Sequence, residues 1–149
     1  MNDDLKKLLK LHEGIRLRPY ICPAGFHTIG VGHNFDANPL PESIGLYLKS
    51  HGCITEEMAD QLLELDIAVA RRGCEKLFPE FPEYSQARQN ALIDMMFNMG
   101  FGTMKTFKTT IALIWDKRWK DAAENLEKSK WYRQVGNRAK TICRMLWEG

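Results

Sequence analysis

Residues 11–35 read LHEGIRLRPYICPAGFHTIGVGHNF, and this stretch decides the fold. It begins at the end of a segment, residues 3–12, in which apolar side chains recur with helical spacing, and Gly14 follows as a helix stop. From Pro19 onward β-branched, aromatic and glycine residues predominate, and residues 22–25 are typical of a tight turn between two strands. A short helix followed by a small antiparallel sheet is therefore expected.

The rest of the chain has a helical pattern. Residues 36–54 are loop-rich, with one short helix expected near residues 42–50. Thr55 can cap a long helix that has glutamates in its first turn, arginines in its last turn and Gly73 as its stop. Beyond residue 85 apolar residues recur with a period near that of an α-helix, which predicts several packed helices.

Together these patterns predict an α+β fold that is mostly helical, in a single domain over residues 1–149. Its expected parts are an N-terminal helix (1–12), a β-lobe (13–54), a long helix between the lobes (55–72) and a helical lobe (73–149).

Composition and charge limit the classes of protein. With 44% hydrophobic and 27% charged residues, the chain is an ordinary globular protein rather than a disordered or coiled-coil one. No apolar run is long enough to span a bilayer, and the N-terminal MNDDLKKLLK lacks the apolar core of a secretory signal. The four cysteines lack metal-binding spacing, so they are expected to be thiols without zinc. Residues 101–149 carry 11 basic and five acidic side chains, which suits an anionic polymer, either nucleic acid or cell wall.

Glu13 is the first candidate for chemistry. It stands at the C-terminal end of the first helix, where burial and the helix dipole both disfavour an ionised carboxylate, as a general acid requires. Eight residues later comes Cys22 at the hairpin turn, and five residues after that comes Thr28 on the returning strand. A helix end and a hairpin can face one another across a groove, with an acid on one wall and a thiol and a hydroxyl on the other. Such a groove fits a polymer chain.

This segment resembles the active-site segment of the bacteriophage-type lysozymes, a glycoside hydrolase family. The family's pattern is Glu, eight residues, Asp or Cys, five residues, Thr, and this chain has its Cys form. Three further stretches resemble family motifs in the same order: ITEEMADQLLELDIAVA (54–70), ALIDMMFNMG (91–100) and KSKWYRQVGNRAK (128–140). The resemblance therefore covers nearly the whole chain.

The resemblance implies an endolysin that hydrolyses the β-1,4 bond between N-acetylmuramic acid and N-acetylglucosamine in peptidoglycan, without metal or cofactor. Glu13 would be the general acid. Thr28 would hold the attacking water in an inverting reaction, which needs room for that water between the two catalytic groups. Cys22 stands where many relatives have Asp, so a weak base, a water-positioning group and a covalent nucleophile all stay open for it.

The resemblance also implies roles outside the catalytic groups. His33 and Asp66 are expected to pair and stabilise the fold, and Arg138 is expected near the catalytic glutamate. Asn98 and Phe97 are expected to bind substrate, although Asn98 could equally be a helix cap before Gly100.

The expected partner is bacterial peptidoglycan, bound by a monomer that neither binds nucleic acid nor inserts stably into a membrane. The enzyme would accumulate in the host cytoplasm and reach the wall after a separate holin-type protein permeabilises the membrane. Three rivals remain: a lytic transglycosylase, because a second carboxylate is missing; a peptidase with Cys22 as nucleophile and His27 or His33 as base; and a non-catalytic wall-binding or nucleic-acid-binding module, because the last third is basic.

Overall fold

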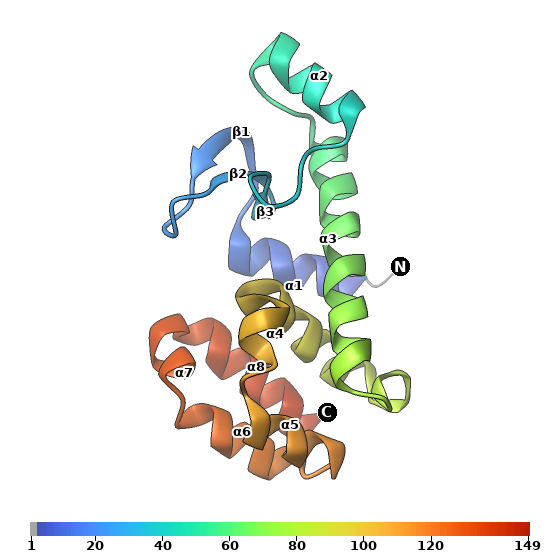
Figure 1. Cartoon of the computed structure of the whole chain (residues 1–149), viewed down its shortest axis with the longest axis vertical. Helices are drawn as coiled ribbons and strands as arrows, with labels where there is room; N and C mark the ends of the chain where they lie inside the picture. Colours follow the sequence, from blue (N-terminus) through green and yellow to red (C-terminus); the bar gives the residue numbers. More distant parts are fainter. Residues whose placement is uncertain (1–2) are drawn as a thin grey trace. The chain divides into compact units, whose positions relative to one another are not determined.

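A computed structural model of the chain describes residues 3–149, and its small antiparallel sheet among many helices confirms the predicted α+β fold (Figure 1). The chain divides into two compact units, which meet in sequence between Asp66 and Ile67. Unit 1 contains the sheet and unit 2 is helical.

Unit 1 begins with helix α1 (Asp3–Glu13), which ends at the predicted stop. The Gly14 backbone has φ +76° and its N–H donates to the Lys10 carbonyl at 2.9 Å, so a glycine suits this helix end. Strands β1 (Arg16–Ile21), β2 (His27–Gly30) and β3 (His33–Asn34) follow and form one antiparallel sheet in the order β1-β2-β3. The predicted turn between β1 and β2 is present.

Helix α2 (Glu42–His51) confirms the short helix expected after the sheet. Its buried residue belongs to an apolar core that joins the sheet, α2 and the first part of the following helix. The members of this core are Ile29, Ile44, Ile54, Ala59 and Leu62. Burial of this cluster fixes the sheet against the helices of unit 1.

Helix α3 (Glu56–Leu77) is capped as predicted, because the Met58 N–H donates to the Thr55 hydroxyl at 3.1 Å. The predicted stop at Gly73 is wrong, since the helix continues to Leu77. The reason is packing: a Cβ atom on Gly73 would lie 3.0 Å from the Met96 methyl carbon. Gly73 and Met96 both belong to unit 2, and the glycine allows the Met96 side chain to approach the helix backbone closely.

Unit 2 contains the remaining helices. After a short 3-10 turn, η1 (Phe81–Glu83), come α4 (Gln86–Met104), α5 (Lys108–Trp115), α6 (Trp119–Glu127), α7 (Lys130–Val135) and α8 (Asn137–Glu148). Gly100 has non-helical angles (φ +79°, ψ 162°), so α4 is interrupted there and continues for one more turn. Cys143, predicted to be a core residue, is 3% exposed.

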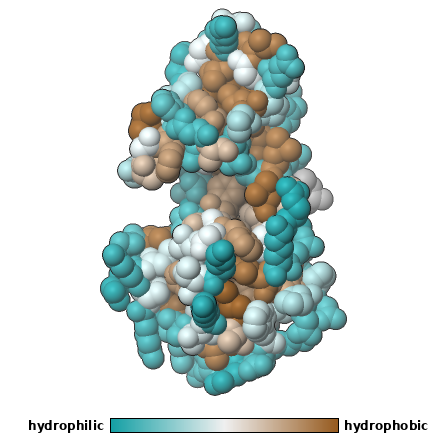
Figure 2. All heavy atoms as spheres, viewed as in Figure 1, coloured by the Kyte–Doolittle hydropathy of each residue, from teal (hydrophilic) through white to brown (hydrophobic). Residues whose placement is uncertain are grey.

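The surface mixes apolar and polar side chains. On the face shown in Figure 2, hydrophobic residues lie interspersed with hydrophilic ones. Ile21 and Phe26 of the β1–β2 hairpin are among the exposed large apolar side chains. Within residues 3–149, none of the helices combines the length and the apolarity needed to cross a membrane.

Candidate active site

Glu13 is the last residue of α1 and its side chain lies against the backbone that follows β2. A Cβ atom built on Gly32 would be 2.7 Å from Glu13 Oε1 and 3.0 Å from Cδ. Gly32 has φ +66°, a conformation that favours glycine. The carboxyl group is therefore in van der Waals contact with the connection between β2 and β3.

The hairpin places Cys22 and Thr28 close together. The Cys22 N–H donates to the Phe26 carbonyl at 3.0 Å, and the Gly25 N–H donates to the Cys22 carbonyl at 2.8 Å, which fixes the turn. Thr28 is 3% exposed, and its hydroxyl donates to the Phe26 carbonyl at 2.9 Å. The turn therefore holds both side chains in defined positions.

The environment of Cys22 favours its thiolate. The pKa of this thiol is lowered mainly by a backbone hydrogen bond from Phe26. Hydrogen bonds from the Thr28 side chain and from the amides of Ala24 and Gly25 lower it further, whereas burial raises it. Because a hydroxyl has one proton, Thr28 can donate either to the sulfur or to the Phe26 carbonyl at any moment.

Tyr20 is a site residue that the sequence reasoning missed. It is the direct cross-strand partner of Thr28, so the two side chains lie on the same face of the sheet, and Cys22 follows directly after the end of β1. Burial raises the pKa of the Tyr20 hydroxyl, and the charges of Glu13 and Cys22 raise it further, against the opposing charge of Arg16. Tyr20 thus lies within electrostatic range of both Glu13 and Cys22. The sequence signal that could have identified Tyr20 is its place two residues before Cys22, at the end of the strand that leads into the turn.

His33 and Asp66 are brought together in unit 1. His33 Nδ1 lies 2.7 Å from Asp66 Oδ2, and its Nε2 lies 2.8 Å from the Asn38 carbonyl oxygen. Burial alone would lower the pKa of His33, but the hydrogen bond and charge of Asp66, with the Asn38 carbonyl, outweigh it and raise the pKa. Both ring nitrogens are therefore engaged within the protein.

The residues of unit 2 that were expected near the catalytic glutamate or the substrate have contacts within unit 2. Arg138 donates to Asp94 Oδ1 from Nε at 2.9 Å and from Nη2 at 2.6 Å, and Asp94 is fully buried. The Trp131 indole N–H donates to the Asn98 side-chain oxygen at 2.8 Å, while Phe97 is half-buried. The expected position of Arg138 near the catalytic glutamate stays a prediction.

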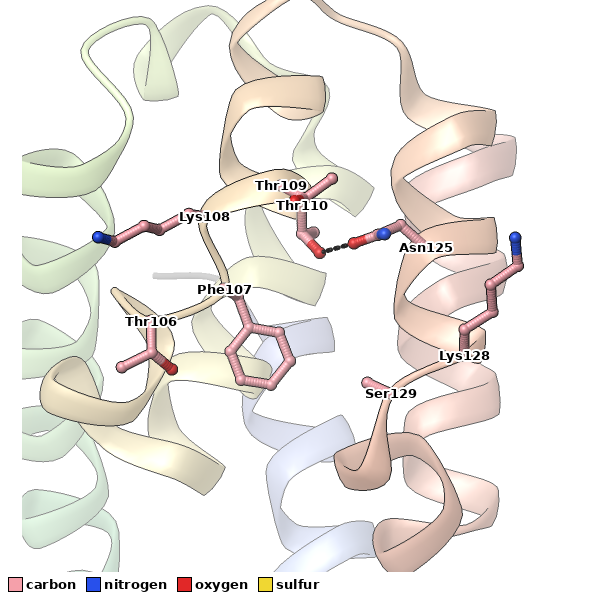
Figure 3. A pocket seen from close by; sticks show the side chains of 8 residues that line it. All are labelled: Thr106, Phe107, Lys108, Thr109, Thr110, Asn125, Lys128 and Ser129. Atoms are coloured by element: carbon pink, nitrogen blue, oxygen red, sulfur yellow. Dashed lines mark hydrogen bonds between the residues drawn. The ribbon is translucent and has the colours of Figure 1, made fainter.

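A polar pocket of about 290 Å³ also lies in unit 2, between the start of α5 and the end of α6 (Figure 3). The buried Thr110 hydroxyl donates to the Asn125 side-chain oxygen at 2.6 Å inside it. Lys108 and Lys128 line the same pocket, and Figure 3 shows their ammonium groups extending outward on its two sides. The interior of this pocket is therefore polar, and its two positive charges lie at the outside.

In the part of the chain that the structure describes, no three His, Cys, Asp or Glu side chains are grouped to hold a metal ion. The four cysteines are free thiols, with Cys74 and Cys143 buried.

A small three-stranded antiparallel sheet in a mostly helical α+β chain is the arrangement of a lysozyme-like fold. Comparison with known proteins agrees. The chain matches the Phage lysozyme family over residues 10–144, so it belongs to that family and is a lysozyme, a muramidase that hydrolyses peptidoglycan.

The match with this chain covers a different share of each relative's length. The chain is 31% identical to probable T4-type lysozyme 1 of Dictyostelium discoideum, over 100% of this chain and 96% of that protein. It is 30% identical to the pre-baseplate central spike protein Gp5 of Enterobacteria phage T4, over 99% of this chain but 28% of that protein. It is 33% identical to an endolysin of Acyrthosiphon pisum secondary endosymbiont phage 1, over 71% of this chain and 62% of that protein.

Proposed function

We propose that this lysozyme cleaves the β-1,4 bond between N-acetylmuramic acid and N-acetylglucosamine with inversion, and that Glu13 is its general acid. The observation that carries this proposal is the surroundings of Tyr20, which pairs with Thr28 and lies within electrostatic range of Glu13 and Cys22. An acid, a hydroxyl and a thiol in one region of unit 1 are the groups that such a reaction requires.

The hydrogen bond of Thr28 assigns it a role in this reaction. A hydroxyl keeps its acceptor lone pairs whether Thr28 donates its proton to the Phe26 carbonyl or to the Cys22 sulfur, so its oxygen can accept a hydrogen bond from a water molecule. That water attacks the anomeric carbon and transfers a proton to the Cys22 thiolate, while Glu13 gives its proton to the leaving oxygen. The new C–O bond forms as the glycosidic bond breaks, and solvent restores both groups to their starting states.

The stereochemistry of the product tests this mechanism. NMR of the fresh product is expected to show the inverted anomer, since water attacks the sugar directly. Retention would contradict the water-attack mechanism and favour covalent attack by Cys22. We expect Glu13→Gln to abolish hydrolysis, Cys22→Asp to keep it, and Cys22→Ala to reduce it by about a hundredfold. Full activity in Cys22→Ala would show that Cys22 has no catalytic role and is only a turn residue.

A lytic transglycosylase is the second candidate, because Cys22 occupies the position at which a carboxylate would activate water. In that reaction the 6-hydroxyl of the sugar attacks instead of water. Mass spectrometry of digested peptidoglycan separates the two reactions, since only the transglycosylase leaves anhydro-muramic ends. A Cys22 peptidase with His33 as its base is less well supported, because both ring nitrogens of His33 already have partners.

We also propose that the enzyme acts as a monomer from the host cytoplasm, after a holin-type protein has permeabilised the membrane. The basic last third and the two lysines beside the Thr110 pocket support binding to the anionic wall polymer. Lysis of intact cells by added enzyme alone, with no permeabilising agent, would contradict the need for a second protein.

A further inference from the structure

Unit 2 contains a pocket that the proposed reaction does not use. Its volume is about 310 Å³, and it is lined by Pro79, Glu80, Tyr84 and Trp115, which come from the segment after α3 and from the end of α5. This volume lies within the range of small-ligand sites, and one sugar ring fits into it. Most of the lining is apolar, so the few polar atoms decide what binds.

Tyr84 is the unusual member of this lining. Its side chain is 6% exposed, and its ring packs edge-on against Trp119 with the ring centres 4.8 Å apart. The hydroxyl is buried and has no hydrogen-bond partner among residues 3–149. Burial and the charges of Glu80 and Glu83 raise the pKa of this hydroxyl, so it keeps its proton and is an unused donor. Such groups are rare in folded proteins, and a ligand that supplies an acceptor would satisfy it.

The other polar and aromatic groups stand at the rim. Trp115 is 52% exposed and its indole N–H donates to the Leu77 carbonyl at 2.8 Å, so the ring is anchored by its nitrogen. The Glu80 side chain is 48% exposed, and its carboxylate lies 3.9 Å from Lys117 Nζ. The rim therefore offers a fixed aromatic ring and a hydrogen-bond acceptor beside the Tyr84 donor.

We propose that this pocket binds an N-acetylhexosamine residue of the glycan strand. The acetamido carbonyl accepts from the Tyr84 hydroxyl, the acetamido N–H donates to the Glu80 carboxylate, and the C–H face of the sugar ring packs on Trp115. An acetamido group has one acceptor and one donor, which match the one unused donor and the one carboxylate of this pocket. The half-exposed Glu80 side chain can move aside to admit the ligand to the hydroxyl, while Trp115 stays in place. A lone water would find few polar partners there.

This inference rests on the proposed function only for the source of the sugar, a glycan that the enzyme also cleaves. The test uses the full-length protein labelled at tryptophan nitrogen and titrated with free N-acetylglucosamine, followed by NMR. We expect the Trp115 indole signal to shift saturably, while Trp147, which is 51% exposed on α8, stays in place as an internal control. Glucose, which lacks the acetamido group, is expected to give no saturable shift.

Tyr84→Phe is the matched variant, because it removes the hydroxyl and keeps the ring. It is expected to weaken N-acetylglucosamine binding about fivefold and, without ligand, to unfold at the same temperature as wild type or higher, since a buried unsatisfied group is lost. An unshifted Trp115, an equal shift with glucose, or unchanged affinity in Tyr84→Phe would overturn the proposal. Peptidoglycan digestion measured in parallel keeps the two proposals separate, because the titration needs no hydrolysis.

Discussion

Gly32 forms the wall against which the Glu13 carboxyl group rests. A Cβ atom at Gly32 would approach Glu13 Oε1 to 2.7 Å, which is closer than a carbon and an oxygen can stand without movement. Gly32 also has φ +66°, where a side chain is strained. The position of Glu13, the proposed general acid, thus depends on the absence of a side chain at Gly32.

We therefore predict that Gly32→Ala moves Glu13 and lowers the rate of peptidoglycan hydrolysis by about tenfold or more, since small displacements of catalytic groups are costly. The backbone strain should also lower the free energy of unfolding by about 1 kcal/mol. Turbidity assays and denaturant unfolding measure the two effects.

Gly52→Ala is the control for strain alone. Gly52 has φ +72°, but the nearest atom to a new Cβ there would be Arg18 Nη1 at 3.8 Å, an ordinary contact. This variant should lose similar stability and keep its activity. Equal loss of activity in both variants would show that general destabilisation, and not contact with Glu13, explains the Gly32→Ala effect.

The lowered pKa of Cys22 predicts selective alkylation. Hydrogen bonds from Phe26, Thr28 and the turn amides favour the Cys22 thiolate, whereas burial raises the pKa of Cys143 to about 12. At pH 7 iodoacetamide should therefore modify Cys22 far faster than Cys143, as peptide mass spectrometry can measure. The pH midpoint for Cys22 modification should lie below that of a free cysteine, and Thr28→Val should raise it. A midpoint at or above the free value would remove the argument for a thiolate base.

The His33–Asp66 pair predicts that stability falls as the pH rises. Because the folded pKa of His33 is raised, its contribution is complete below the unfolded pKa of about 6.5 and is lost as the pH rises through the folded pKa. Asp66→Asn should remove this dependence and lower the free energy of unfolding by about 3 kcal/mol at acidic pH. Urea unfolding of both proteins between pH 5 and pH 9 tests this. A wild-type stability that stays constant or increases over this range would contradict it.

Local sequence signals predicted most of unit 1. Gly14 marked the helix end and residues 22–25 marked the turn, because both features depend on backbone conformation that a few neighbouring residues determine. The helix stop predicted at Gly73 was wrong because the role of this glycine is not decided by its neighbours in sequence. Its role depends on contact with Met96, 23 positions away, and a helix-stop glycine and a close-packing glycine look alike in sequence.

The hydrogen-bond partners within unit 2 could not be predicted from the sequence either. Asp94 lies in an apolar helix and appears out of place until the Arg138 side chain reaches it, 44 positions further on. The unpartnered Tyr84 hydroxyl gave no signal, because an absent hydrogen bond can be recognised only when the surroundings are known. Catalytic candidates were easier to find, since Glu13, Cys22 and Thr28 lie within one short segment whose turn fixes their spacing.

Asn98 offers a way to separate structural support from substrate binding. Its side-chain oxygen accepts the Trp131 indole N–H at 2.8 Å, and Trp131 is 8% exposed, so the oxygen has a structural role. The amide nitrogen of Asn98 is the group that could donate to a substrate carbonyl. Asn98→Ala removes both groups, whereas Asn98→Asp keeps an oxygen acceptor for Trp131 and removes the donor.

We predict that Asn98→Ala lowers the free energy of unfolding by about 1 kcal/mol, because the Trp131 N–H loses its acceptor, and that Asn98→Asp stays close to wild type. If Asn98 also binds substrate, both variants should raise the KM for soluble peptidoglycan fragments, since both lack the amide donor. Steady-state kinetics combined with thermal unfolding distinguishes the two roles. An unchanged KM in Asn98→Asp would leave Asn98 as a structural partner of Trp131 and remove it from the substrate-binding residues.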